Sequence, residues 1–125
     1  MDNKKTGQIG EEAAVGFLEK NGYQILEKNF RTKLGEIDII AKEKDTVCFI
    51  EVKFRQEAFL DSPLDAITPF KRRKLSQVAL MFLKQHNLLE VSARFDVVSI
   101  ETDNQGHSDI HLLKDAFELV SSYRY

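Results

Sequence analysis

Several residue types are scarce in this sequence of 125 residues, and each scarcity excludes a class of protein. The single cysteine, Cys48, rules out an intramolecular disulfide, and its place in an apolar run predicts a buried structural thiol. No run approaches the roughly 20 apolar residues that a membrane span needs. The polar segment Met1–Gly10 also lacks the apolar core of a secretory signal. We therefore expect a cytoplasmic protein without membrane contact.

Strong positive charge is also missing. The formal net charge is −2, so the chain lacks the globally basic profile of a protein that holds duplex DNA by charge alone. Any contact with nucleic acid must depend on local basic patches, whereas a metal site made of carboxylates would itself push the charge negative. Hydrophobic residues make up 42% of the chain, which is enough for a core. The length predicts one domain over residues 1–125.

Periodicity and turn signals predict an α/β fold with the order α-β-β-β-α-β. The expected main elements are a helix from a Thr6 cap to Asn21 with Gly22 behind it, strands over Tyr23–Phe30, Gly35–Ala41 and Thr46–Arg55, a long helix from Thr68-Pro69 to His86, and a strand over Ser92–Glu101. The crossover through the long helix should make the last main strand parallel to its neighbour. This order predicts a mixed sheet flanked by helices.

Weaker signals predict three further elements. An edge strand is expected over Asp109–Leu113, and short helices are expected over Leu64–Ile67 and Asp115–Val120. The polar turn Lys42–Asp45 between two β-prone segments is the clearest hairpin in the chain.

This hairpin carries the residues with the strongest chemical signal. Glu51 and Lys53 share one face of their strand, because side chains alternate with a period of two. Asp38 can come opposite them when the hairpin closes around its turn. Two carboxylates and an ammonium in one small volume suit Mg²⁺ or Mn²⁺, which take oxygen ligands and act in phosphodiester cleavage. We therefore predict a metal-dependent nuclease site.

The tripeptide around Glu51 is weak evidence by itself, since Glu-x-Lys occurs by chance roughly once in a chain of this composition. Asp38 adds to it, because it interrupts an apolar strand between Ile37 and Ile39. The alternative is a salt-bridged, solvent-facing side of the sheet, where such charges are ordinary. The pattern alone gives the two interpretations about equal weight.

Two helical residues favour the site. Glu11 falls at the edge of the apolar stripe of the first helix, and Lys71 falls on the face of the long helix that should meet the sheet. Charges in such places need partners, which a shared polar site would supply. In the alternative interpretation, both side chains lie near helix ends and reach solvent.

Five motifs, spread over nearly the whole chain, resemble the YraN-type family of small bacterial endonuclease-like proteins. They are G-x-x-G-E-x-x-A (Gly7 to Ala14), N-F-R-x-x-x-G-E-I-D-I-I-A (Asn29 to Ala41), F-I-E-V-K-x-R (Phe49 to Arg55), A-I-T-P-x-K (Ala66 to Lys71) and R-F-D-V-V (Arg94 to Val98). That family is similar in turn to archaeal Holliday-junction resolvases and to the PD-(D/E)xK superfamily.

The resemblance implies a restriction-endonuclease-like mixed β-sheet flanked by helices. It also implies Asp38 and Glu51 as metal ligands, Lys53 as the catalytic lysine and Glu11 as the residue that completes the metal site. One departure is that Ile37, and not proline, precedes Asp38, so the literal "PD" is absent.

The leading hypothesis is a magnesium-dependent endonuclease that acts on DNA, including branched or structured DNA. The candidate phosphate contacts are basic side chains: Lys71, Arg72, Arg73, Lys74, Arg55, Arg31 and Arg94. The second hypothesis is a catalytically silent nuclease fold that binds nucleic acid or a protein. Hydrolysis of RNA or of a small nucleotide is a third interpretation.

The oligomeric state stays open at this point. A junction resolvase would be a two-fold dimer. The apolar residues of the C-terminal tail suit an interface and core packing equally well: Phe117, Leu119, Val120, Tyr123 and Tyr125.

Overall fold

The computed structural model describes residues 3–56 and 67–119, with side chains from Gly10 onward. Seven elements follow one another in these ranges: α1 (Asn3–Lys20), β1 (Tyr23–Thr32), β2 (Gly35–Glu43), β3 (Thr46–Gln56), α2 (Pro69–Gln85), β4 (Ser92–Thr102) and β5 (Ser108–Phe117). The order is α-β-β-β-α-β-β, so the predicted α/β class is confirmed and the edge strand becomes a full element.

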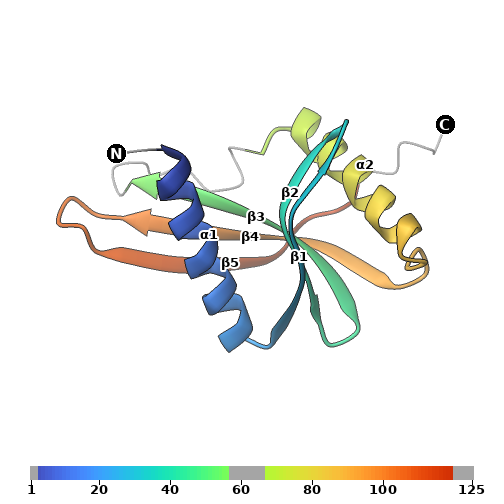
Figure 1. Cartoon of the computed structure of the whole chain (residues 1–125), viewed down its shortest axis with the longest axis horizontal. Helices are drawn as coiled ribbons and strands as arrows, with labels where there is room; N and C mark the ends of the chain where they lie inside the picture. Colours follow the sequence, from blue (N-terminus) through green and yellow to red (C-terminus); the bar gives the residue numbers. More distant parts are fainter. Residues whose placement is uncertain (1–2, 57–66, 120–125) are drawn as a thin grey trace.

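The sheet has five strands in the order β1-β2-β3-β4-β5. Neighbours pair antiparallel except β3 and β4, which pair parallel through the crossover that contains α2. The predicted parallel pairing is therefore confirmed. In Figure 1 the β1–β2 hairpin rises steeply across the other three strands, as the twist of a sheet requires.

Side-chain alternation along β3 divides the core into two clusters. Cys48, Ile50 and Val52 pack with Ala14 and Leu18 of α1. In the other cluster Phe49, the residue between the first two, packs with the apolar side of α2. Since neighbouring residues of a strand point to opposite faces, α1 and α2 cover opposite faces of the sheet.

Local signals set the helix ends with one exception. Thr68 caps α2 by accepting a hydrogen bond from the Lys71 backbone N–H at 3.2 Å, and Pro69 is the first helical residue, as predicted. Gly22 follows α1 with a φ of +89°, as its position predicted. The predicted start at Thr6 is wrong, because α1 already begins at Asn3.

The helix predicted from Asp115 is also wrong, because β5 continues to Phe117. Long-range contacts override the local signal there. The Asp115 backbone N–H donates to Asp96 Oδ1 at 2.8 Å, and the Phe117 ring stacks on Phe95 with 4.5 Å between centroids. Asp115 adopts a φ of +54° where the pairing of β4 and β5 shifts register.

Some predictions fall outside the described ranges. These are the short helix over 64–67, apart from Ile67, and the tail residues from Val120 onward. Phe117 is buried in the core, and Leu119 packs against it. Within the described chain, neither helix is long and apolar enough to cross a bilayer.

Candidate metal centre

The candidate site lies where β2 and β3 separate. Their pairing runs from Glu43–Thr46 to Ile39–Ile50, and the next positions in that register are Asp38 and Glu51. Beyond this point, within the described chain, β2 pairs only with β1, and β3 only with β4. The fork thus opens at the two carboxylates that the hairpin was predicted to bring together.

A hydrogen bond to the backbone fixes Asp38 across the fork. Asp38 Oδ2 accepts it from the Val52 backbone N–H at 2.8 Å. The Asp38 backbone N–H also lies near enough to the Glu51 carboxylate to lower its pKa. The Asp38 side chain therefore takes the place of a backbone partner that the separating strands no longer provide, and both carboxylates are held on rigid strands.

Neither carboxylate has enough positive charge nearby to offset its burial, so the pKa of each is raised. Burial raises the pKa of Glu51 well above its ordinary value, and the neighbouring Asp38 charge raises it further. Burial also raises the pKa of Asp38, as do the nearby carboxylates of Glu11 and Glu36. Lys53 acts in the opposite direction on both groups, but burial is the largest cause for each.

These interactions also place the other predicted members of the site. Lys53 and Glu11 both lie near enough to Asp38 to change its pKa. Glu36 was missed by the sequence reasoning, although it raises the pKa of both Asp38 and Glu51. Its position two residues before Asp38 on the same strand was the available signal, because residues spaced by two share a face.

The donor set fits a small divalent cation in a limited way. Glu51 Oε1 is buried and has no hydrogen-bond partner, which is costly for a carboxylate oxygen unless a cation or water meets it. Among the described residues, however, no group of three His, Cys, Asp or Glu side chains is arranged to hold a metal ion. The fit is thus to the pair Asp38 and Glu51, with Glu11 nearby. Magnesium is commonly held by one or two carboxylates, with waters and substrate oxygens completing its shell.

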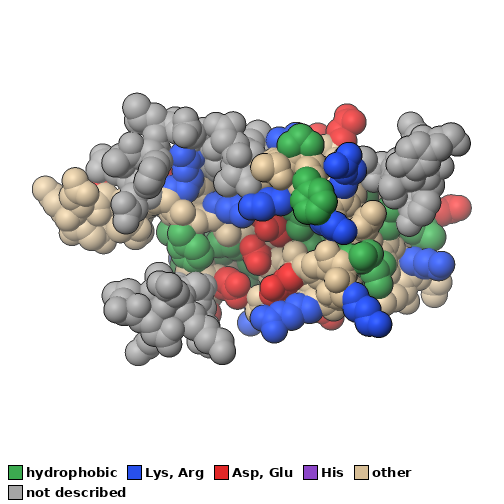
Figure 2. All heavy atoms as spheres, turned by 90° about the horizontal axis from the view of Figure 1, so that it is seen from above, with side chains coloured by type: hydrophobic (Ala, Val, Ile, Leu, Met, Phe, Trp, Pro, Cys, Tyr) green, Lys and Arg blue, Asp and Glu red, His purple; other side chains and the backbone are tan. Residues whose placement is uncertain are grey.

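Basic side chains surround the acidic cluster unevenly. Figure 2 shows acidic side chains in the middle of one face, with Lys and Arg side chains on either side of them. Arg31 pairs with Glu36 at 3.2 Å while its side chain stays 75% exposed. Arg55 lies two residues beyond Lys53 on β3. Lys71 was expected to face the sheet, but it is exposed in the first turn of α2.

The same helix turn holds three more of the predicted phosphate contacts. Arg72 points inward, since its Nε donates to the Ile67 carbonyl at 3.1 Å and its guanidinium lies 5.2 Å from the Phe117 ring centroid. Arg73 is exposed, and Lys74 is half-buried with its Nζ 5.5 Å from the Phe70 ring centroid.

Arg94 corrects one prediction, because the structure does not bring it to the site. Its guanidinium donates to Asp96 Oδ1 at 2.9 Å, to Glu43 Oε1 at 2.7 Å and to the Tyr23 hydroxyl at 3.0 Å. Only 19% of its side chain is exposed, and Asp96 is fully buried. Arg94 neutralises an internal carboxylate at the start of β4, and its Nε and Nη2 donors are directed to that internal network rather than to the site.

The thiol of Cys48 lies beside this network and is fully buried, as the sequence predicted. Burial raises its pKa to about 12, which keeps the thiol protonated and unreactive.

Comparison with known proteins places the chain among relatives that match it along most of its length. A UPF0102 protein of Geotalea daltonii is 46% identical over 119 residues, which cover 95% of this chain and 94% of the relative. One from Caldicellulosiruptor saccharolyticus is 46% identical over 118 residues, which cover 94% of this chain and the whole relative. One from Acetivibrio thermocellus is 42% identical over 122 residues.

The family described as "Uncharacterised protein family UPF0102" matches residues 10–100. This range contains four of the five motifs in full and the whole candidate site, and it confirms the resemblance to the YraN-type family. The chain therefore belongs to the UPF0102 family.

Proposed function

We propose that this protein is a magnesium-dependent endonuclease that hydrolyses phosphodiester bonds in DNA. The observation that carries the proposal is the pair Asp38 and Glu51 at the β2–β3 fork, where the buried oxygen Glu51 Oε1 has no partner. Two carboxylates on rigid strands beside a lysine are the groups that metal-assisted phosphodiester hydrolysis uses.

Hydrolysis adds the oxygen of water to phosphorus, breaks one P–O ester bond and gives the departing sugar oxygen a proton. In this proposal Asp38 and Glu51 hold the metal, with Glu11 as a further oxygen donor. When bound, Mg²⁺ supplies a Lewis acid for the phosphoryl oxygens. Manganese is the natural substitute, because it takes the same oxygen ligands.

Lys53 has a separate task. Its ammonium lies close enough to Asp38 and Glu51 to lower the pKa of both. From that place it can orient the attacking water by a hydrogen bond, and it can neutralise negative charge that grows on the phosphate during the reaction. Both tasks need its positive charge and its reach along the face shared with Glu51.

The experiment uses the full chain with linear duplex, single-stranded and four-way-junction DNA, in Mg²⁺, in Mn²⁺ and in EDTA. Cleavage should require the metal and should be lost in Asp38→Ala and in Lys53→Ala. Asp45→Ala and Lys42→Ala are matched controls, since both residues are exposed on the same hairpin, away from the fork. They should cleave as the unaltered protein does.

Three results would count against the proposal. Cleavage that persists in Asp38→Ala with EDTA present would point to a contaminating enzyme. DNA binding without cleavage in either metal would instead favour a catalytically silent module that binds nucleic acid, and absence of DNA binding would favour a module that binds a protein.

A further inference from the structure

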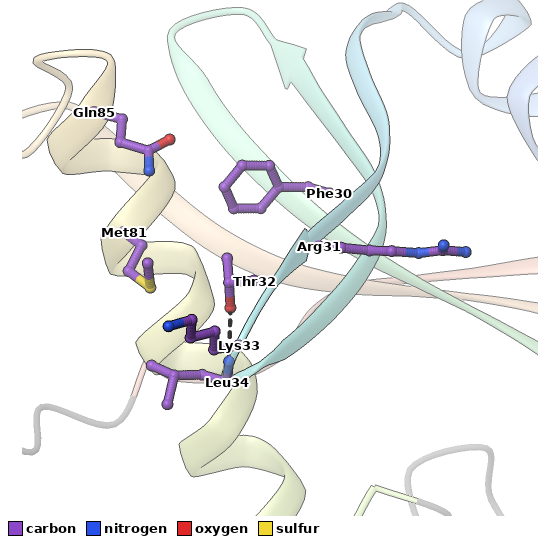
Figure 3. A pocket seen from close by; sticks show the side chains of 7 residues that line it. All are labelled: Phe30, Arg31, Thr32, Lys33, Leu34, Met81 and Gln85. Atoms are coloured by element: carbon purple, nitrogen blue, oxygen red, sulfur yellow. Dashed lines mark hydrogen bonds between the residues drawn. The ribbon is translucent and has the colours of Figure 1, made fainter.

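The sheet face under α2 has an apolar half and a polar half. The apolar half includes Phe49 and Val97, and α2 packs on it. The helix lies against β2, and its Met81 and Gln85 lie across an open cavity from Phe30 of β1 (Figure 3). The polar half is the continuation of β3 and β4 beyond this core, and it carries the candidate site.

Ser99 of β4 belongs to this polar half. It pairs in register with Lys53 of β3, so both side chains leave the same face of the sheet, and Glu51 lies two residues before Lys53 on that face. Ser99 is only 1% exposed, and its Oγ has no hydrogen-bond partner among the described residues. A buried hydroxyl without a partner is costly, so we expect Ser99 to gain one when the site is in use.

The other neighbours of Ser99 on this face offer it little. Val97, two residues earlier on β4, is apolar and belongs to the core. His111 pairs with Ser99 from β5, but its Nε2 lies 3.5 Å from Glu101 Oε2, so these two side chains meet each other. Lys53 is the neighbour whose chemistry fits, because an ammonium has three donors and a serine oxygen can accept.

The Lys53 ammonium has two places to go on this face. Its charge lowers the pKa of Asp38 and of Glu51, so it lies near both carboxylates. A divalent cation held by those carboxylates would repel it, since both groups are positive. The lysine stem is long and flexible, and neighbouring strands lie only about 4.8 Å apart, so the ammonium can reach the hydroxyl of Ser99 instead.

We propose that Ser99 is a positioning residue for Lys53: when the carboxylates hold a cation, Ser99 Oγ accepts a hydrogen bond from the Lys53 ammonium. The inference rests on the proposed function, which gives Lys53 the task of orienting the attacking water. The hydrogen bond fixes the ammonium beside the site, where its direction matters for that task, and it also satisfies the buried hydroxyl. Ser99 acts through Lys53 and contacts neither the metal nor the substrate.

The first test observes the Lys53 ammonium by NMR in the full chain labelled with ¹⁵N-lysine. Mg²⁺ alone is added, without DNA, and the Lys53 signal is identified by its absence from Lys53→Met. A hydrogen-bonded ammonium exchanges its protons with water more slowly than a free one, so Mg²⁺ should sharpen this signal. The sharpening should be lost in Ser99→Ala and kept in Ser99→Thr, which retains a hydroxyl.

The second test is a double-mutant cycle on DNA cleavage. Ser99→Ala should lower kcat about tenfold and leave KM unchanged, because the loss of a hydrogen bond to a charged group affects only the orientation of Lys53. Ser99→Thr should restore most of the rate. In a Lys53→Met background the change Ser99→Ala should lower kcat no further, since the group that Ser99 positions is already gone.

Ser76→Ala is the matched control. Ser76 is also a fully buried serine, but its Oγ donates to the Arg72 carbonyl within α2 at 2.8 Å. The control should keep kcat and the Mg²⁺ response of Lys53. Ser99→Ala should be at least as stable as the unaltered protein in urea with EDTA, because it removes a buried hydroxyl that lacks a partner among the described residues.

The outcomes separate this inference from the proposed function. A Mg²⁺ response of Lys53 that is unchanged in Ser99→Ala overturns the inference and leaves the nuclease proposal standing. An equal loss of kcat from Ser99→Ala with and without the Lys53 ammonium does the same, because Ser99 would then act on another group. A response that depends on Ser99, without cleavage of any DNA, supports the inference and overturns the nuclease proposal. No response of Lys53 to Mg²⁺ in the unaltered protein overturns both.

Discussion

Asp38 and Glu51 lie opposite each other across the β2–β3 fork, and the charge of Asp38 raises the pKa of the buried Glu51. Asp38 Oδ2 accepts a hydrogen bond from the Val52 backbone N–H at 2.8 Å, which fixes its carboxylate beside Glu51. A cation bound beside these two carboxylates would therefore stabilise their ionised forms.

The first prediction concerns the charge of Lys53. Lys53→Met keeps the aliphatic stem and removes the ammonium, so the cleavage rate should fall by about 100-fold or more. The affinity for Mg²⁺, measured by calorimetry, should not fall, because Lys53 is not an oxygen ligand. A large loss of Mg²⁺ affinity in Lys53→Met would contradict the role assigned to this residue.

The second prediction concerns the pH dependence of stability in the metal-free protein. The pKa of Glu51 is raised in the folded state, so folding favours the protonated form. The contribution of Glu51 to stability is therefore complete below its ordinary pKa and is lost as the pH rises through the raised value. Stability from urea unfolding in EDTA should fall between about pH 5 and about pH 8.5.

Glu51→Gln should flatten that fall, because glutamine does not ionise. At about pH 8.5 the variant should be more stable than the unaltered protein in EDTA by about 1 kcal/mol or more. Saturating Mg²⁺ should raise the melting temperature of the unaltered protein at this pH and have a smaller effect on the variant. An unchanged pH dependence in Glu51→Gln would show that Glu51 is ordinarily ionised without metal.

The third prediction concerns the contact between Gly10 and Phe54. A methyl group on Gly10 would overlap the Phe54 ring, so α1 approaches β3 only because this residue lacks a side chain. Gly10→Ala should destabilise the protein by about 1 kcal/mol or more through this overlap. In a Phe54→Ala background the sign should reverse, since alanine stabilises a helix interior by about 1 kcal/mol over glycine.

A double-mutant cycle of the Gly10 and Phe54 variants measures this coupling directly. Gly16→Ala is the matched control, because nothing lies within 4 Å of a methyl group at Gly16 in the same helix. Its effect should be stabilising and independent of Phe54. Additive effects of Gly10→Ala and Phe54→Ala would mean that the ring moves aside without cost.

The fourth prediction separates structural from substrate-facing arginines. Arg94→Ala leaves the fully buried Asp96 without its charge partner and should cost about 3–5 kcal/mol in unfolding free energy. Arg31→Ala breaks an exposed pair with Glu36 and should cost about 1 kcal/mol or less. Reduced DNA affinity in a stably folded Arg94→Ala protein would restore Arg94 as a phosphate contact.

The sequence by itself determined the features that arise from neighbouring residues. The period-two pattern of Thr46–Arg55 set which residues share a face, and it put Glu51 and Lys53 together. The Thr68-Pro69 pair marked the start of α2, because capping and a fixed proline φ are local effects. The hairpin turn fixed the register, and the register set Asp38 opposite Glu51.

Only the tertiary structure decided what depends on residues far apart in the chain. The sequence predicted Arg94 as a phosphate contact. In the structure it donates hydrogen bonds to Tyr23 and Glu43, which lie more than 50 residues away in the chain. Local propensity predicted that a helix begins at Asp115. In the structure the Asp115 backbone N–H instead donates to Asp96, and the chain stays in β5. The fork itself and the approach of Glu36 to Glu51 on the neighbouring strand come from sheet twist and strand pairing. These arise from long-range contacts, which local propensity does not encode.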